Sequence, residues 1–315
     1  MNIENLKADE GIVSKKLFDI FQRFSDREFI FAEPGGNYGD YLIYKGAYKL
    51  AKSANLKFTA LKFSEFHKRT YSDETIIYIH GSGGFVPWWF DSGIEVIKKI
   101  SQEFKGFLIL GPTTFSDDID FLKPALYDCM GNSHFKKLFI FAREQKSYSI
   151  LEKCLPCPAE VICDHDTALN LVMSDLSTGA KPSGRYDLYA MRYDKERPTG
   201  QFYNYFFWLD PIDASSSFAE WVDFHAHAKK IITNRAHSAI LGNILGIPTV
   251  MLPNNYHKNR SIWENSLNDR GVQWSEQIDC SFLNRVIEAN PALRRVFTSY
   301  KYRKILKFRL KYFRI

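Results

Sequence analysis

The segment 229–259, KKIITNRAHSAILGNILGIPTVMLPNNYHKN, holds the side chains best suited to chemistry. An apolar run ending at Thr233 predicts a strand, and the apolar spacing that follows predicts a helix that stops at Gly246. Arg235 and His237 would then lie where the strand ends and the helix begins. A helix N-terminus disfavours the protonated imidazole and a bound anion favours it, so His237 would be poised for proton transfer. A histidine on an apolar helix face is usually a core residue, and it is the adjacent Arg235 that argues for a site.

Two glycine-rich turns follow strand-like runs in the first half of the chain. The first, PGGNYGDYLI, leads into a helix pattern and carries Asn37, Gly39 and Asp40. Its glycine spacing fits neither GxGxxG nor the Walker pattern, which argues against a dinucleotide site. The alternative is that these glycines only ease a tight turn. The second, HGSGGF from His80, is similar to the oxyanion loop of some esterases, but no GxSxG elbow accompanies it.

Metal and redox chemistry have little support in the sequence. The five cysteines include one CxxC, CLPC at 154–157, and no second pair of ligands at zinc spacing follows it. The tripeptide DHD, 164–166, imitates the DxD metal motif of some glycosyltransferases but is too short to be specific. We therefore expect reduced structural thiols, no metal and no cofactor.

The positive charge of the chain is concentrated at its end. The formal net charge is +6, yet residues 294–315 hold nine Lys or Arg and no acid, which leaves −3 for the rest. Aromatic and aliphatic side chains alternate with these cations, a composition typical of an interfacial helix on an anionic membrane surface. The alternative is a solvated terminal helix that caps the domain. Nucleic acid is not an expected partner.

The composition is that of a globular protein, with 45% hydrophobic and 16% aromatic residues in 315. No run of about 18 apolar residues predicts a membrane-spanning helix, and the N-terminus lacks a signal-peptide pattern. We expect a cytoplasmic protein that associates peripherally with the inner face of the plasma membrane.

Short apolar runs alternate with helical stretches along the whole chain. The eight runs are REFIFAEP, TIIYIHG, GFLILGP, KLFIFAR, AEVICDHD, YDLYAMRYD, KKIITNRA and IPTVMLP. Such runs are typical of parallel strands covered on both faces, so the sequence predicts an α/β protein with two doubly wound domains. We place these domains at 1–150 and 151–293, facing each other across a cleft, with a basic tail at 294–315.

Seven segments together resemble the polysaccharide pyruvyl transferase family. In chain order they are GGNYGDYLI, HGSGGF, FAREQKSYSIL, DHDTAL, YAMRYDKER, NRAHSAILGNILGIPTV and NNYHKN. The resemblance spans roughly residues 30–270. It implies a GT-B-like fold of two Rossmann-like domains with the active site between them. It also implies transfer of the enolpyruvyl moiety of phosphoenolpyruvate onto a sugar, giving a pyruvate ketal.

The resemblance also implies roles for individual residues. The family's R-x-H motif matches Arg235 and His237, and its R-E-x-x-S helix begins at Arg143. A Gly is often found where this chain has His257, which leaves the sugar-side contacts less defined. The predicted catalytic residues are His237 and Asp40, the donor-binding residues are Arg235, Arg143 and Lys258, and the acceptor-binding residues are Asn37, Gly39, His80, Trp88 and Tyr256.

Physical chemistry agrees with such a donor. Phosphoenolpyruvate carries a carboxylate and a phosphate, so its site needs fixed cations, with arginines as planar donors and lysine as a point charge. The acceptor is a sugar or a lipid-linked oligosaccharide of a cell-surface polysaccharide. Two other readings stay open: a GT-B glycosyltransferase that uses a nucleotide sugar, and a non-catalytic glycan- or membrane-binding protein that keeps the fold.

Overall fold

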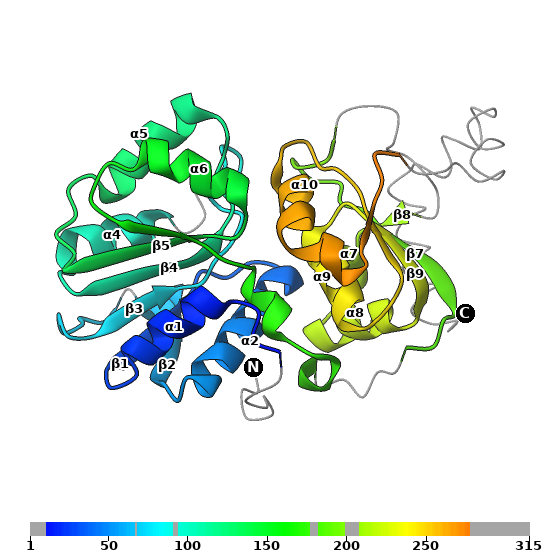
Figure 1. The fold of residues 1–315 in the computed structure, drawn as a ribbon, viewed down its shortest axis with the longest axis horizontal. Helices are drawn as coiled ribbons and strands as arrows, with labels where there is room; N and C mark the ends of the chain where they lie inside the picture. The colour runs from blue at the N-terminus through cyan, green and yellow to red at the C-terminus, as the bar shows by residue number, and fades with distance from the viewer. Residues whose placement is uncertain (1–10, 67, 91–93, 177–181, 199–207, 278–315) are drawn as a thin grey trace. The chain divides into compact units, whose positions relative to one another are not determined.

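The computed structural model describes residues 11–66, 68–90, 94–176, 182–198 and 208–277. The chain divides into two compact units, Met1–Ser177 and Thr178–Ile315, each built around its own parallel sheet (Figure 1). The basic tail predicted at 294–315 lies outside the described residues. No helix among the described residues is both long enough and apolar enough to cross a bilayer.

The first unit contains a six-stranded sheet in the order β2-β1-β3-β4-β5-β6, with every pair parallel. The strands are β1 (Glu28–Glu33), β2 (Lys57–Lys62), β3 (Ile76–Ile79), β4 (Phe107–Thr113), β5 (Lys137–Ala142) and β6 (Glu160–Cys163). The helices are α1 (Lys15–Arg23), α2 (Tyr38–Ser53), α3 (Phe63–Phe66), α4 (Ile94–Glu103), α5 (Ile119–Met130) and α6 (Gln145–Cys154), followed by the 3₁₀ turns η1 (Thr167–Asn170) and η2 (Met173–Leu176).

Helices cover both faces of this sheet. Alternate side chains of a strand point to opposite faces, so a fully buried strand such as β3 needs a core on each side. Ile77 belongs to the apolar cluster that includes side chains of α4, α5 and α6. Its neighbour Tyr78 faces the other way, with its ring 5.3 Å from that of Phe21 in α1. The unit is therefore doubly wound, as the continuous apolar runs predicted.

The boundary between the units lies later than the sequence predicted. The run AEVIC, placed at the start of a second domain from 151, forms β6 and pairs with β5 at the edge of the first sheet. The turns η1 and η2 also belong to the first unit, where the Thr167 hydroxyl donates to the Ile43 carbonyl of α2 at 2.9 Å. The division consequently falls after Ser177, and the boundary at 150 is wrong.

The second unit contains a five-stranded sheet in the order β11-β10-β9-β7-β8, again parallel throughout. Its strands are β7 (Tyr186–Ala190), β8 (Trp208–Leu209), β9 (Ala228–Thr233), β10 (Thr249–Met251) and β11 (Gln273–Trp274). Its helices are α7 (Pro211–Ala214), α8 (Phe218–Ala226), α9 (Ala236–Ile244) and α10 (Lys258–Ile262), with a π turn η3 (Trp263–Leu267) and a 3₁₀ turn η4 (Asn268–Arg270).

The central β9–α9–β10 element follows the sequence pattern closely. The helix α9 ends before Gly246, whose φ of +68° is the left-handed conformation that favours glycine. Gly242 lets this helix approach the sheet, because a Cβ at that position would lie 2.3 Å from Oγ1 of Thr249 in β10. The close packing fixes where the first turn of α9 lies relative to the strand ends.

Both sheets follow the same connection rule, so the predicted fold class is confirmed. In each, the first strand of the unit lies inside the sheet, with the second strand on one side and the third on the other. The chain thus reverses its direction of growth between β1 and β3 in the first unit and between β7 and β9 in the second. Ligands of open α/β sheets bind outside the carboxyl ends of the strands at such switch points. The cleft between the domains stays a prediction.

Candidate active site

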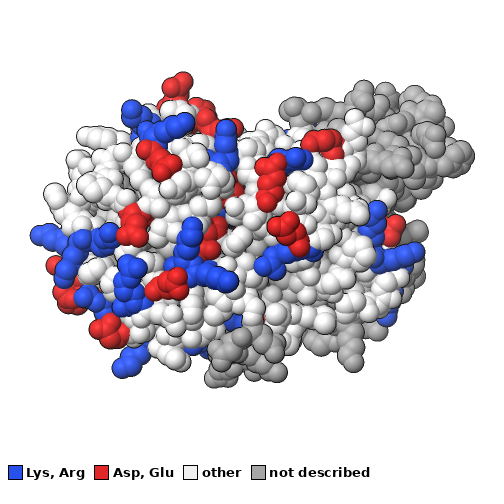
Figure 2. All heavy atoms as spheres, viewed as in Figure 1, with Lys and Arg blue, Asp and Glu red and all other residues white. Residues whose placement is uncertain are grey.

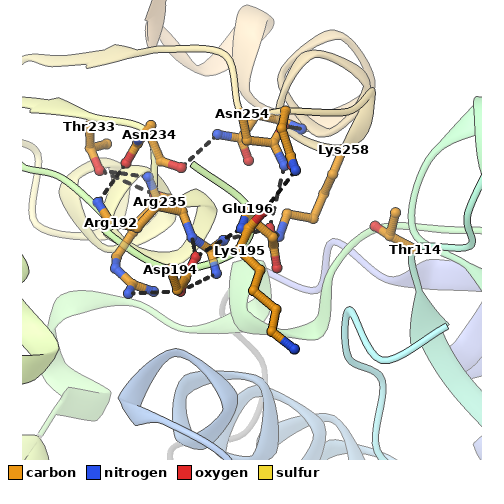
Figure 3. Close-up of polar contacts among 12 residues, drawn as sticks. Thr114, Arg192, Asp194, Lys195, Glu196, Thr233, Asn234, Arg235, Asn254 and Lys258 are labelled. Atoms are coloured by element: carbon orange, nitrogen blue, oxygen red, sulfur yellow. Dashed lines mark hydrogen bonds and ion pairs between the residues drawn. The ribbon is translucent and has the colours of Figure 1, made fainter. Parts of the chain in front are cut away.

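The switch point of the second sheet is lined by the segments that follow β7, β9 and β10. These are MRYDKE after β7, NRAH after β9 and LPNNYHK after β10. Figure 3 shows that charged side chains of all three segments point toward one another. Five charged residues of these segments, together with Asp210 after β8, form what we call the switch-point cluster; its members are Arg192, Asp194, Glu196, Asp210, Arg235 and Lys258.

Arg235 and His237 are held at the start of α9, as predicted. Arg235 occupies the N-cap position with extended backbone, and His237 lies in the first turn, half-buried. Thr233 fixes the approach to this helix. Its buried hydroxyl donates to the Ala190 carbonyl of β7 at 2.6 Å and accepts from the Arg235 amide at 2.9 Å. One side chain therefore ties together the ends of the two strands that form the switch point.

Arg192 and Lys258 are the two deeply enclosed cations of the switch-point cluster, each with 7% of its side chain exposed. Nε and Nη2 of Arg192 each donate to one oxygen of Asp194 at 2.7 Å, and Nη1 donates to Glu196 at 2.5 Å. Burial opposes the charged form of Arg192, but the carboxylates of Glu196 and Asp194 outweigh it and raise its pKa. Burial likewise opposes ionisation of Asp194, yet Arg192 holds the pKa of that carboxyl below its usual value.

The nearest partner of Arg235 is a different carboxylate, that of Asp210. Its Nη2 donates to Asp210 and, at 3.4 Å, to Asp194. Asp210 also caps α7, because its other oxygen accepts from the Ile212 amide at 3.1 Å. Burial raises the pKa of Asp210, and the opposing effect of Arg235 does not cancel it. The pair is thus strongly desolvated, which makes each partner dependent on the other.

Lys258 completes the switch-point cluster from the first residue of α10. Its side chain is buried, Nζ forms an ion pair with Glu196, and the ammonium lies 5.3 Å from the centre of the Tyr256 ring. The amide of Asn254 also donates to Glu196, at 3.4 Å. Lys258 and Tyr256, predicted to bind different substrates, are therefore neighbours in one loop.

The switch-point cluster joins three cations and three carboxylates around a strand end and a helix N-terminus. This set of planar and point-charge donors, with a histidine in the first turn of the helix, can bind an anion and move a proton. Figure 2 shows both signs of surface charge interspersed over the visible face of the described residues. The charges of the switch-point cluster differ from these because most are buried.

Comparison with known proteins identifies the family of this chain. The model of a family described as polysaccharide pyruvyl transferase matches residues 37–256. The chain belongs to the polysaccharide pyruvyl transferase family. The match begins at Asn37, the N-cap of α2, and includes the whole of β9 and α9 and the loop after β10 as far as Tyr256. Transfer of pyruvyl groups to polysaccharide is the activity of this family.

Solved structures support the fold. A crystal structure of a functionally uncharacterized protein from Klebsiella pneumoniae is similar to this polysaccharide pyruvyl transferase family member, with a TM-score of 0.65 and 20% sequence identity. The similarity covers 84% of this chain and 99% of that one. No curated protein matches the chain in sequence.

In the first unit of this polysaccharide pyruvyl transferase family member, the predicted acceptor loop is a helix cap. Asn37 accepts from the Gly39 amide at 2.8 Å, and Asp40 accepts from the Asn37 amide at 2.8 Å, which together make a capping box on α2. The tight turn before it needs glycine, because a Cβ at Gly36, where φ is +125°, would lie 2.2 Å from the Asp40 carboxylate. The catalytic role predicted for Asp40 stays a prediction beside this observed structural one.

His80 does not line a surface, contrary to its predicted contact with the acceptor. The ring is 1% exposed and is surrounded by the rings of Tyr44, Tyr48, Tyr78 and Phe31, with centroids between 4.3 and 5.6 Å away. Burial lowers its pKa to about 3. Neither ring nitrogen has a hydrogen-bond partner in the described part of the chain. His80 is therefore a neutral core residue of the first unit.

Arg143 and Trp88 also belong to the first unit. Arg143 lies directly after β5 and is 1% exposed; Nη1 donates to Asp166 at 2.9 Å and Nε donates to the Thr114 hydroxyl at 2.7 Å. Trp88 is partly buried in the turn that follows HGSGGF. The donor role of Arg143 and the acceptor role of Trp88 stay predictions.

The DHD tripeptide serves the fold. Asp164 accepts from the Leu17 amide at 2.8 Å in the first turn of α1, while Asp166 pairs with Arg143 and caps η1. Burial raises the pKa of Asp164 to about 6. Among the described residues, no group of three or more His, Cys, Asp or Glu is placed to hold a metal ion.

Four members of the switch-point cluster had no predicted role. Three of them, Arg192, Asp194 and Glu196, lie in the segment YAMRYDKER, which carries the family resemblance. A dense mixture of charges directly after a buried strand was the signal available there. Asp210 had no such signal, because it reaches Arg235 from a distant turn of the chain.

Proposed function

We propose that this protein transfers the pyruvyl group of phosphoenolpyruvate to two hydroxyls of a sugar in a cell-surface polysaccharide or its precursor, forming a pyruvate ketal and releasing phosphate. The observation that carries the proposal is the set of cations at the second switch point. Arg235, Arg192 and Lys258 converge there, and His237 follows Arg235 in the first turn of α9, in a chain of the pyruvyl transferase family.

Arg235 is best placed to contact the donor. It lies at the N-cap of α9, a nine-residue helix whose first N–H groups and dipole favour an anion. Its Nη2 is used by Asp210 and Asp194, but its buried Nε has no hydrogen-bond partner among the described residues. A buried guanidinium N–H normally donates to some acceptor. A carboxylate or phosphoryl oxygen of the donor would supply it.

The reaction balances without a further co-reactant. One proton adds to the methylene carbon of phosphoenolpyruvate, which becomes a methyl group and leaves an oxocarbenium-like centre at C2. Two sugar hydroxyls form C–O bonds to C2, and the C–O bond to phosphate breaks. Of the two protons that the hydroxyls release, one replaces the proton spent on the methylene carbon and one leaves with phosphate. His237, half-buried beside Arg235, is the residue we assign to this proton transfer.

The acceptor side is less defined than the donor side. Tyr256 presents a ring next to Lys258 and suits stacking on a sugar face. Asn37, Gly39 and Trp88 stay candidates from the first unit. His80 is not retained as a contact residue, because its ring is enclosed by the core.

An acceptor-dependent assay tests the proposal. Purified protein is incubated with phosphoenolpyruvate and a panel of galactosides, glucosides and mannosamine derivatives, and inorganic phosphate is measured. We expect phosphate release that requires one acceptor and a product heavier by one pyruvyl group. Release of nucleotide from a nucleotide sugar, with no use of phosphoenolpyruvate, would instead establish a glycosyltransferase.

His237→Gln tests the assignment of proton transfer. The amide keeps hydrogen-bonding capacity but does not titrate, so kcat should fall by about 10² to 10⁴-fold. Because His237 is half-buried at a helix start, the melting temperature should change by only a few degrees. His227→Gln is the control, since His227 lies partly exposed at the opposite, amino-terminal end of β9. A rate near normal for His237→Gln would remove that residue from the mechanism.

A further inference from the structure

Three donors converge on a single carboxylate oxygen in the switch-point cluster. Oε2 of Glu196 accepts from Nη1 of Arg192 at 2.5 Å, from Nδ2 of Asn254 at 3.4 Å, and from Nζ of Lys258. Arg192 and Glu196 follow β7, whereas Asn254 and Lys258 follow β10. Two loops thus meet around one anionic oxygen, and 4% of the Glu196 side chain is exposed. An arginine, a lysine and an amide around one oxygen would serve equally well for an oxygen of a bound anion.

A second carboxylate, that of Asp210, forms an ion pair with Arg235. Oδ2 of Asp210 accepts from Nη2 of Arg235, and 6% of the Asp210 side chain is exposed. The third carboxylate, Asp194, differs from both. It holds Arg192 through two parallel bonds of 2.7 Å, the geometry that orients a guanidinium, and it is 28% exposed.

The switch-point cluster as described is formally neutral, with three cations and three carboxylates. A donor with a carboxylate and a phosphate adds up to three negative charges. Excess negative charge at close range in a desolvated site is strongly unfavourable. The cations therefore cannot serve the donor fully while every internal carboxylate stays ionised and in place.

We propose that Glu196 and Asp210 are internal counter-anions that occupy two anion subsites of the switch-point cluster, one on Arg192 and Lys258 and one on Arg235, and that a doubly anionic donor replaces them. Asp194 stays on Arg192 throughout and keeps its orientation. This inference rests on the proposed function, because it assumes that the donor carries two anionic groups. It assigns to Arg192, for which the sequence predicted no role, a direct part in anion binding.

The chemistry of Asp210 suits displacement. Burial raises its pKa despite the adjacent Arg235, so it can leave the ion pair as a neutral acid when an anion takes over the guanidinium. Its second oxygen can continue to cap α7 in either protonation state, because the Ile212 amide donates to that oxygen. Donor binding would then take up protons, while the helix cap persists.

The test compares the affinity of isosteric variants for two anions. Asp210→Asn and Glu196→Gln remove one internal negative charge each and keep the side-chain shape. Asn also remains a favourable N-cap, so Asp210→Asn is expected to fold. Dissociation constants for inorganic phosphate and for phosphoenolpyruvate are measured by calorimetry at fixed pH and ionic strength. Each variant should bind phosphoenolpyruvate about tenfold more tightly than the unaltered protein.

Two control variants separate displacement from simple loss of charge. Asp194→Asn removes the same charge from the same cluster but loosens Arg192. The affinity of this variant for phosphoenolpyruvate should therefore not increase. Glu264→Gln removes the charge of an exposed ion pair with Arg260 in the same unit and should change nothing measurable at moderate salt.

The outcomes decide between clear alternatives. Tighter binding in Asp210→Asn and Glu196→Gln, without tightening in Asp194→Asn, supports the proposal. Equal tightening in all three variants would overturn it in favour of a long-range charge effect, and weaker binding in the first two would show that they only position the cations. If Glu196→Gln does not fold, Asp210→Asn decides. Tighter phosphate binding without any pyruvyl transfer would refute the proposed function and would still show that Glu196 and Asp210 compete with an anion for these cations.

Discussion

The switch point of the second sheet, between β7 and β9, is filled by six charged side chains, whereas that of the first sheet, between β1 and β3, is closed by a helix cap and a cage of aromatic rings. The two sheets have equivalent strand orders, and both switch points receive the carboxyl ends of parallel strands. In the second unit Arg192 and Arg235 follow those ends; in the first, Asn37 and His80 do.

The contrast shows that topology provides a crevice but side chains decide its chemistry. The first unit does contain a buried arginine, Arg143, which pairs with Asp166 and donates to the Thr114 hydroxyl. In the switch-point cluster, Glu196 serves two cations and Arg235 contacts two carboxylates, so the pairing can be rearranged. We therefore expect substitutions in the second unit to change activity most and those in the first unit to change stability most.

The largest effect is expected for Arg235→Ala. Loss of the guanidinium at the start of α9 should lower kcat/KM for phosphoenolpyruvate by about 10³-fold or more. It also leaves the carboxylate of Asp210 buried without its partner, which should cost about 3–5 kcal/mol of folding stability. The double variant Arg235→Ala/Asp210→Asn should recover the stability and not the activity, as measured by urea unfolding and phosphate release. Recovery of activity in the double variant would show that Arg235 only neutralises Asp210.

For the buried pair of the first unit we expect a loss of stability without a loss of affinity for phosphoenolpyruvate. Arg143→Met removes the guanidinium that pairs with the buried Asp166 carboxylate and should cost about 3–5 kcal/mol. Because matched apolar replacements of a buried pair are often nearly neutral, Arg143→Met/Asp166→Leu should recover most of that loss. Urea unfolding measures both. If the folded double variant loses affinity for phosphoenolpyruvate, Arg143 belongs to the donor site as the sequence predicted, and the contrast between the two units narrows.

A smaller effect of opposite sign is expected for His80→Phe. The change removes two buried ring nitrogens that lack hydrogen-bond partners in the described structure, and it keeps an aromatic ring in the cage. Unfolding free energy at pH 7 should rise by about 1 kcal/mol. The KM for the acceptor should not change. An increased KM would return His80 to the acceptor site.

The same variant should flatten the dependence of stability on pH. Burial lowers the pKa of His80 to about 3 and that of His225 to about 4, so below pH 6.5 the unfolded chain binds protons that the folded chain does not. Each histidine therefore destabilises the fold on acidification, by about 1.4 kcal/mol per pH unit. Asp164, with its pKa raised to about 6, acts in the opposite direction between pH 6 and 4. The net loss over that range should largely disappear in His80→Phe.

The smallest effect is expected at the capping box. Asn37→Ala should cost about 1 kcal/mol of stability through the loss of the α2 cap. Asp40→Asn keeps the shape of its side chain. The equilibrium constant of unfolding and the rate of pyruvyl transfer should each change by less than about threefold. A loss of transfer beyond about a hundredfold in Asp40→Asn, with normal melting, would establish the catalytic role that the sequence predicted.

Eight of the eleven strands among the described residues were recognisable in the sequence, and three were not. The recognised ones form the interiors of the two sheets and the β6 edge, and most read as continuous apolar runs. The missed strands β2, β8 and β11 all lie at sheet edges. β2 has mostly exposed or half-exposed side chains, and β8 and β11 have two residues each, so no apolar run of useful length marks them. The predicted domain boundary was wrong for a related reason, because the pairing of β6 with β5 is a long-range contact that no local pattern in the sequence marks.

The site shows the same division between local and long-range information. Strand, turn and helix signals around Thr233 and Gly246 were local, so the position of Arg235 and His237 at the start of α9 followed from the sequence. Which side chains are buried could not be predicted from the sequence. His80 was predicted to bind the acceptor, yet it is enclosed because Tyr44 and Tyr48 of α2 pack over the end of β3.

The sequence by itself determined that this chain is an α/β protein with two parallel sheets, and that an arginine and a histidine begin the helix after β9. Both follow from the periodicity and capping of short segments. Only the tertiary structure decided which charges meet. Glu196 joins Lys258 across 62 residues of chain, and Asp210 joins Arg235 across 25. Such pairs depend on the order of strands in the sheet, which brings the ends of β7, β8, β9 and β10 to one region whatever their separation along the chain.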